Sequence, residues 1–114
     1  MKILPTKMLK PYNSFSIDEN AELIIEAETT QDLIDIWSSE KYSKSVKLPL
    51  GRGSNTLFCG PFEGIVVLNR LLGKEVEEKG NDYLITVASG EDWPSFVEWC
   101  VEHDYYGIEN LAMI

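Results

Sequence analysis

Two glycines and two small polar residues follow a short apolar run near the middle of the chain, in the stretch Leu50-Gly51-Arg52-Gly53-Ser54-Asn55-Thr56-Leu57-Phe58. Glycine adopts positive φ at little cost, and its missing Cβ lets backbone N–H groups come close to an anion. Ser54 and Asn55 add side-chain donors, and Arg52 adds a positive charge. The stretch therefore predicts a loop that binds a phosphate group, with a solvated turn as the alternative.

Two better-known phosphate-binding loops do not match this stretch. A Walker A loop needs Gly-Lys followed by Ser or Thr, and the chain contains no such sequence. A Rossmann loop needs a third small residue at the start of a long helix. Thr56 stands at that position, and Gly60-Pro61 would soon interrupt a helix. If the stretch binds a diphosphate, we expect loop amides rather than a long helix dipole to hold it.

The residues on either side of the loop predict an alternation of strands and helices. Residues 1–20 contain two prolines and a polar string, which is typical of an extended arm with a few apolar anchors. Strands are predicted at residues 21–27, 46–50 and 64–68, followed by a hairpin of residues 74–79 with 82–88. Pro49 indicates a sheet edge or a strand end. The order is that of an α+β, or mixed α/β, fold.

Two segments have the apolar periodicity of helices. Thr29 or Thr30 can cap the first, with Asp32 near the third position, and this helix runs to about residues 39–42. The second spans residues 92–103 and contains Pro94 in its first turn, where proline is tolerated. The side chains expected to face the core are Leu33, Ile36 and Trp37 in the first helix, and Trp93, Phe96, Val97, Cys100 and Val101 in the second.

The composition excludes several classes of protein. The chain has 114 residues, of which 44% are hydrophobic and 25% charged, and this fits one small domain or a piece of a larger one. A net charge of −9 disfavours nucleic acid and anionic membrane as partners. No run approaches the ~18 apolar residues of a membrane helix, and the first residues lack the pattern of a signal peptide. We therefore expect a cytoplasmic protein.

The remaining polar signals favour structural roles. Residues 41–52 contain four basic residues and no acid, which suits either a small anion or a solvated helix end. Cys59 and Cys100 have no second ligand at metal-binding spacing, so we expect two reduced thiols and no metal site. His103 stands at the end of the second helix, where contact with the helix dipole and with solvent explains it better than catalysis.

Several segments carry a more specific resemblance than the loop alone. They are residues 50–58 with 64–70, the segment Tyr12-Asn13-Ser14-Phe15-Ser16-Ile17, the segment Ala88-Ser89-Gly90-Glu91-Asp92-Trp93, and the final Gly107-Ile108-Glu109-Asn110-Leu111-Ala112-Met113-Ile114. In order and spacing they resemble bacterial UDP-N-acetylenolpyruvoylglucosamine reductases of the longer-chain type. The segments cover nearly the whole chain, which would then be the N-terminal part of such an enzyme.

The resemblance implies a fold and a cofactor site. The fold is the FAD-binding, two-subdomain α+β type shared with p-cresol methylhydroxylase and vanillyl-alcohol oxidase, here with a first subdomain over residues 21–58 and the start of a second over 59–114. The implied FAD-binding residues are Leu50, Gly51, Arg52, Gly53, Ser54, Asn55, Thr56 and Leu57, with Ile114 opening a second cofactor segment. Arg52 departs from the acidic or small residue common in the family. The family's catalytic residues would lie beyond residue 114.

The resemblance also implies an activity. NADPH would reduce FAD, and the reduced flavin would pass hydride to the enolpyruvyl double bond of UDP-N-acetylglucosamine enolpyruvate. The product, UDP-N-acetylmuramate, is a precursor of peptidoglycan. The implied partners are therefore a small-molecule cofactor and a UDP-sugar substrate, with neither nucleic acid nor membrane.

Two other functions remain open from the residues. One is an FAD oxidase of the same fold with non-covalent flavin, since no histidine precedes His103 to attach the cofactor near the loop. The other is a non-catalytic small α+β domain that binds a protein through its sheet. If the loop does hold FAD, we expect Gly53→Val to weaken FAD binding with little change in the fold, and residues 1–114 alone to bind FAD weakly.

Overall fold

The structure is a computed structural model that describes residues 1–113, and the chain divides into two compact units. The first unit is Met1–Leu71, and the second begins at Leu72. This division falls after residue 71, whereas the subdomain boundary implied by the family resemblance lies near residue 58. The reason is that strand β4 (Phe62–Asn69) is paired on both sides within the sheet of the first unit.

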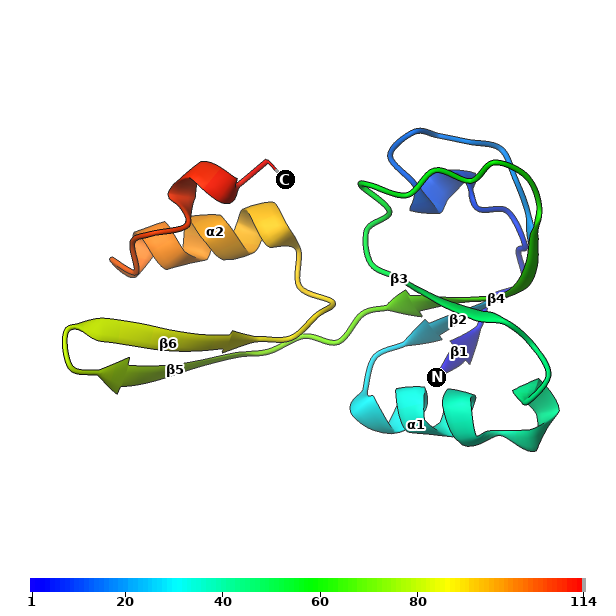
Figure 1. Cartoon of the computed structure of the whole chain (residues 1–114), viewed down its shortest axis with the longest axis horizontal. Helices are drawn as coiled ribbons and strands as arrows, with labels where there is room; N and C mark the ends of the chain where they lie inside the picture. The colour runs from blue at the N-terminus through cyan, green and yellow to red at the C-terminus, as the bar shows by residue number, and fades with distance from the viewer. Residues whose placement is uncertain (114) are drawn as a thin grey trace. The chain divides into compact units, whose positions relative to one another are not determined.

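Four strands form the sheet of the first unit, in the order β1-β2-β4-β3 (Figure 1). β1 (Lys2–Ile3) is antiparallel to β2 (Ala21–Ala27), whereas β2 and β3 (Lys47–Leu50) both run parallel to β4. The strands predicted before and after the glycine loop are confirmed. β3 lies at the edge of the sheet, which is where Pro49 is tolerated.

Helix α1 (Thr30–Ser38) connects β2 to β3 and is followed by the 3-10 turn η2 (Glu40–Tyr42). Thr29 caps the helix as predicted: its hydroxyl accepts from Asp32 N at 3.1 Å, and the Asp32 carboxylate accepts from Thr29 N at 3.0 Å. Ile36 is buried, but Trp37 is 46% exposed, so its predicted core position is wrong. Trp37 lies about 100° around the helix from Ile36, on its exposed side.

Both faces of the sheet are covered. One face packs against α1 and η2 in a cluster of six buried residues, namely Ile25, Ala27, Ile36, Tyr42, Ile65 and Val67. The other face forms a second cluster, of Leu9, Ala21, Ile24, Leu50, Phe58, Val66 and Leu68. In Figure 1 the N-terminal segment and the glycine loop lie on the side of the sheet opposite α1. Non-helical chain therefore covers the second face.

The N-terminal segment is a packed part of the first unit rather than the arm that we expected. Leu9 is fully buried, and a 3-10 turn η1 (Lys10–Tyr12) follows it. Ser14 N donates to the carbonyl of Gly53 at 3.0 Å, which joins this segment to the glycine loop. Gly53 has φ +67°, and a Cβ there would collide with the Tyr12 carbonyl and lie 2.8 Å from Asn13 Cα. The two segments pack backbone to backbone at this glycine.

The second unit consists of a hairpin and a helix. β5 (Lys74–Lys79) and β6 (Asp82–Val87) form the predicted antiparallel pair, with Gly80 at φ +62° in the turn. Helix α2 (Trp93–Glu102) begins after Asp92, which accepts from Ser95 N, and η3 (Glu109–Leu111) follows. Phe96, Val97 and Cys100 are buried as predicted. Val101 is 40% exposed, because it lies off the face that these three share.

Among residues 1–113, no helix has the length and apolarity needed to cross a membrane.

Asp32→Asn should make the free energy of unfolding of the chain less dependent on pH in the acidic range. The Met1 ammonium at 2.7 Å, together with the Glu28 and Thr29 N–H groups, lowers the pKa of Asp32 from 3.8 to about 2. Because the folded pKa is depressed, the ionised carboxylate stabilises the fold above pH ~4 and loses this effect as the pH falls toward 2. Urea unfolding of both proteins from pH 7 to pH 2 measures this. A stability difference that is constant over this range would contradict it.

Gly53→Ala should lower the free energy of unfolding of the first unit by about 2 kcal/mol or more, since a positive φ and a backbone clash both oppose the methyl group. Gly51→Ala is the matched control, because a Cβ there meets nothing within 4 Å. The control should change stability by less than about 1 kcal/mol. Amide signals of β2 and β4 followed in urea report on this unit, and equal effects of the two variants would rule out the packing role.

Cys59 and Cys100 should differ sharply in reactivity toward a thiol reagent. Cys59 is exposed, whereas Cys100 is fully buried on α2, and burial raises the pKa of the Cys100 thiol. We expect Cys59 to react with Ellman's reagent at least about 100-fold faster, because Cys100 reacts only when α2 opens. Cys59→Ser isolates the slow phase. Similar rates at both thiols would mean that the second unit opens freely.

Candidate phosphate-binding loop

The predicted loop begins where β3 ends, at the carboxyl edge of three parallel strands. Leu50 is buried as the last residue of β3, and Gly53 is buried against the N-terminal segment. The remaining predicted residues lie nearer the surface: Gly51, Arg52, Ser54, Asn55 and Leu57 are exposed, and Thr56 is half-buried. Ile114 lies outside the described residues. Eight of the nine predicted residues are therefore consecutive, from the buried end of β3 into the loop that follows, at the strand edge where ligands of parallel sheets commonly bind.

Two carbonyl groups of the loop are held from behind. Ser14 N donates to Gly53 O at 3.0 Å, and the Arg70 guanidinium donates through Nη1 to Gly51 O at 3.2 Å. Arg70 follows β4 directly and is itself held, since its Nε lies 3.8 Å from a carboxylate oxygen of Glu26 on β2. The loop is thus anchored both to the N-terminal segment, through Ser14, and to the end of β4, through Arg70.

These anchors determine where the loop amides point. In a trans peptide the N–H is directed opposite to the preceding C=O. Because the Gly53 carbonyl faces Ser14, the Ser54 N–H faces away from the N-terminal segment. Within the described part of the chain, the N–H groups of Gly53, Ser54 and Asn55 donate no hydrogen bond to another residue. Consecutive unpaired N–H groups beside a residue at positive φ are an arrangement that binds anions in proteins.

The role expected for Gly53 needs a correction. Its missing Cβ is required for contact with Tyr12 and Asn13, so Gly53→Val would disrupt the first unit rather than leave the fold little changed. Both loop glycines are described by the structure, and of the two only Gly53 has a positive φ. The role of Gly53 is therefore structural: it lets the N-terminal segment come close enough for Ser14 N to bond the Gly53 carbonyl.

Sequence reasoning missed the residues that hold the loop. Ser14, Asn13 and Arg70 were noticed only as parts of a resemblance, and their contacts join positions far apart in the chain. A local signal did exist, because Asn13 interrupts a segment with apolar anchors and is the one buried polar residue among those that the structure describes.

The basic residues before the loop support the solvated helix end rather than an anion site. Lys47 Nζ donates to the Tyr42 and Ser45 carbonyls at 2.6 and 3.3 Å, and Lys41 Nζ lies 5.2 Å from the centre of the Tyr42 ring. These two cations cap and pack the chain after α1. Arg52 alone of the four basic residues belongs to the loop itself.

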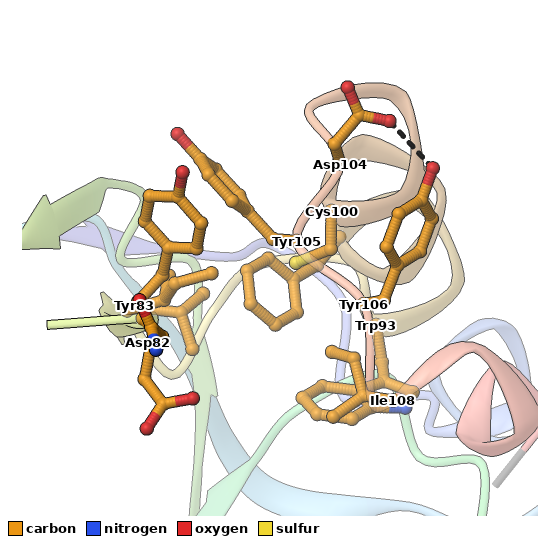
Figure 2. A pocket seen from close by; sticks show the side chains of 12 residues that line it. Asp82, Tyr83, Trp93, Cys100, Asp104, Tyr105, Tyr106 and Ile108 are labelled. Carbon is orange, nitrogen blue, oxygen red and sulfur yellow. Dashed lines mark hydrogen bonds between the residues drawn. The ribbon is translucent and has the colours of Figure 1, made fainter. Parts of the chain in front are cut away.

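A cavity of about 610 Å³ lies within the second unit, between β6 and α2 (Figure 2). Aromatic and apolar side chains line most of it, among them Tyr83, Phe96, Tyr105 and Ile108. The Tyr106 hydroxyl donates to Asp104 at 2.6 Å, which raises the pKa of Tyr106, and the Cys100 thiol is held neutral by burial. These groups suit packing against an apolar surface better than nucleophilic catalysis.

Comparison with known proteins shows the family of the chain. A family model described as "FAD binding domain" matches residues 21–114. Over all 114 residues the chain is 66% identical to UDP-N-acetylenolpyruvoylglucosamine reductase of Aliivibrio fischeri, 47% identical to that of Photobacterium profundum and 44% identical to that of Vibrio vulnificus. It spans 33% of the length of each of these relatives. The match over residues 21–114 shows that the chain belongs to the FAD-binding domain family.

Proposed function

We propose that the chain is the FAD-binding N-terminal portion of an NADPH-dependent reductase that converts UDP-N-acetylglucosamine enolpyruvate to UDP-N-acetylmuramate. The observation that carries the proposal is the 66% identity, along the whole chain, to a relative named UDP-N-acetylenolpyruvoylglucosamine reductase. Membership of the FAD-binding domain family supports the cofactor. In this proposal the first subdomain ends at Leu71, in keeping with the compact units.

The part of this chain in the reaction is to hold the cofactor's diphosphate. The N–H groups of Gly53, Ser54 and Asn55 would donate to its oxygens, and charge-assisted bonds of this kind are the strong ones. Arg52 and the side chains of Ser54 and Asn55 would add charge and further donors. Leu50, Thr56, Leu57 and Ile114 would line the cofactor, as the family resemblance implies. Bound flavin would supply hydride transfer between NADPH and the enolpyruvyl double bond.

The proposed partners follow from this reaction. They are FAD, NADPH and a UDP-sugar, all small anions, and we place the protein in the cytoplasm, where such nucleotides are made. A net charge of −9 argues against nucleic acid or an anionic membrane as a partner. The hydrogen-bond donors of residues 52–55 would allow this acidic chain to bind an anion at the loop.

Titration of the ¹⁵N-labelled chain tests the proposal. FAD and ADP should shift the amide signals of Gly53, Ser54 and Asn55, whereas riboflavin and adenosine, which lack the diphosphate, should not. We expect FAD to bind the 114-residue chain with a Kd weaker than about 10 µM, because a single loop supplies few of the charge-assisted contacts that are worth about 1.5–3 kcal/mol each.

A chimera supplies the positive control. Residues 1–114 replacing the matching part of the Aliivibrio fischeri relative should retain FAD through purification and oxidise NADPH only when the enolpyruvyl substrate is present. Equal shifts with ADP and adenosine would refute the role of the loop. A flavin-loaded chimera that consumes oxygen without this substrate would instead favour an oxidase.

A further inference from the structure

Asn13 is a buried polar side chain whose surroundings are fully defined. It is 6% exposed, and its amide makes three hydrogen bonds to the backbone. Nδ2 donates to Leu9 O at 2.9 Å and to Ile17 O at 3.2 Å, and Oδ1 accepts from Ile17 N at 2.9 Å. Three bonds from one amide thus close the chain from Leu9 to Ile17 into a compact loop.

This arrangement requires an amide at position 13. Only a group with donors and an acceptor on one planar end serves two carbonyls and an N–H together. Aspartate would place a carboxylate against the Leu9 and Ile17 carbonyls. An apolar side chain would leave the half-buried N–H and C=O of Ile17 without the partner that Asn13 provides, whereas Leu9 O would keep its bond from Tyr12 N. The side chain therefore determines the backbone path of the segment.

The same path sets the direction of the Ser14 N–H. Ser16 N donates to Asn13 O at 3.1 Å, so residues 13–16 form a β-turn with Ser14 at its second position. Ser14 N lies outside this turn bond and donates to Gly53 O at 3.0 Å. Gly53 rests on the backbone of the same turn, since a Cβ there would lie 2.8 Å from Asn13 Cα.

We propose that Asn13 is a positioning residue for the cofactor loop. Its amide fixes the turn at residues 13–16, the Ser14 N–H of that turn holds the Gly53 carbonyl, and the held carbonyl directs the Ser54 N–H toward the diphosphate. The diphosphate itself rests on the proposed function, whereas the orientation of the loop amides does not.

Ser14→Pro detaches the loop while keeping the Asn13 amide. Proline lacks the N–H that holds Gly53 and places its ring Cδ against the Gly53 carbonyl, so the loop must shift, and proline is favoured at the second position of a β-turn. Asn13 has φ −141° and ψ 141°, the extended conformation that a following proline requires. Asn13→Ala tests the amide itself. Ile36→Val is the control. Ile36 is buried on the other face of the sheet, so this substitution destabilises the same unit without altering a contact of the loop.

Amide spectra without ligand and titration with ADP give two separate readouts. Ser14→Pro and Asn13→Ala should move the Ser54 and Asn55 amide signals and raise the Kd for ADP about tenfold, as the loss of one oriented charge-assisted bond predicts. Ile36→Val should do neither at temperatures where it is folded. Should Asn13→Ala fail to fold, Ser14→Pro still decides.

Unchanged Ser54 and Asn55 signals in Ser14→Pro would overturn the inference, and so would an unchanged Kd for ADP in that variant. If the unmodified chain does not bind ADP at all, the proposed function fails, while the ligand-free spectra still report whether Asn13 and Ser14 position the loop.

Discussion

β4 is buried on both faces, since five successive residues from Gly64 to Leu68 are shielded from solvent. The arrangement of the first unit follows from the need to cover both faces of this strand. A parallel sheet needs cover on each side, because its strands are apolar on both. Helix α1 covers one face, and irregular chain covers the other. Irregular chain brings backbone polar groups into contact with the core, and these need partners. The buried amide of Asn13 supplies partners for Leu9 and Ile17, so the segment that covers the sheet and the turn that holds Gly53 depend on the same side chain.

Local patterns predicted what local chemistry determines. The strand at 21–27, the Thr29 cap and the hairpin after residue 73 depend on neighbours in sequence, and each was predictable. Trp37 and the boundary between the units were not, because burial of a helical residue depends on the surface beside it, and β4 joins a sheet whose other strands lie up to 60 residues earlier in sequence. The glycine loop was found from composition, but its anchors Ser14 and Arg70 are contacts over long sequence separations.

The loop illustrates how a backbone site differs from a side-chain site. Its donors are N–H groups that every residue except proline possesses, so their usefulness lies entirely in orientation. Orientation comes from two carbonyls that are held in hydrogen bonds by Ser14 and Arg70. The positive charge of Arg70 serves the loop indirectly, as a donor behind it, and its own position is fixed by Glu26 on β2. In the proposed function, an acidic protein would in this way bind an anion without a cluster of exposed cations.

β5 has a consequence for the behaviour of the protein in concentrated solution. Lys74, Glu75, Glu77, Glu78 and Lys79 leave Val76 as its one uncharged residue, and from Glu75 onward the strand is exposed. A strand with charges on both faces is a poor template for a further strand, so like molecules repel where their hairpins would otherwise join. The three glutamates provide most of this repulsion. Salt screens repulsion between exposed charges, and high ionic strength is therefore the condition under which chains of this protein would begin to associate.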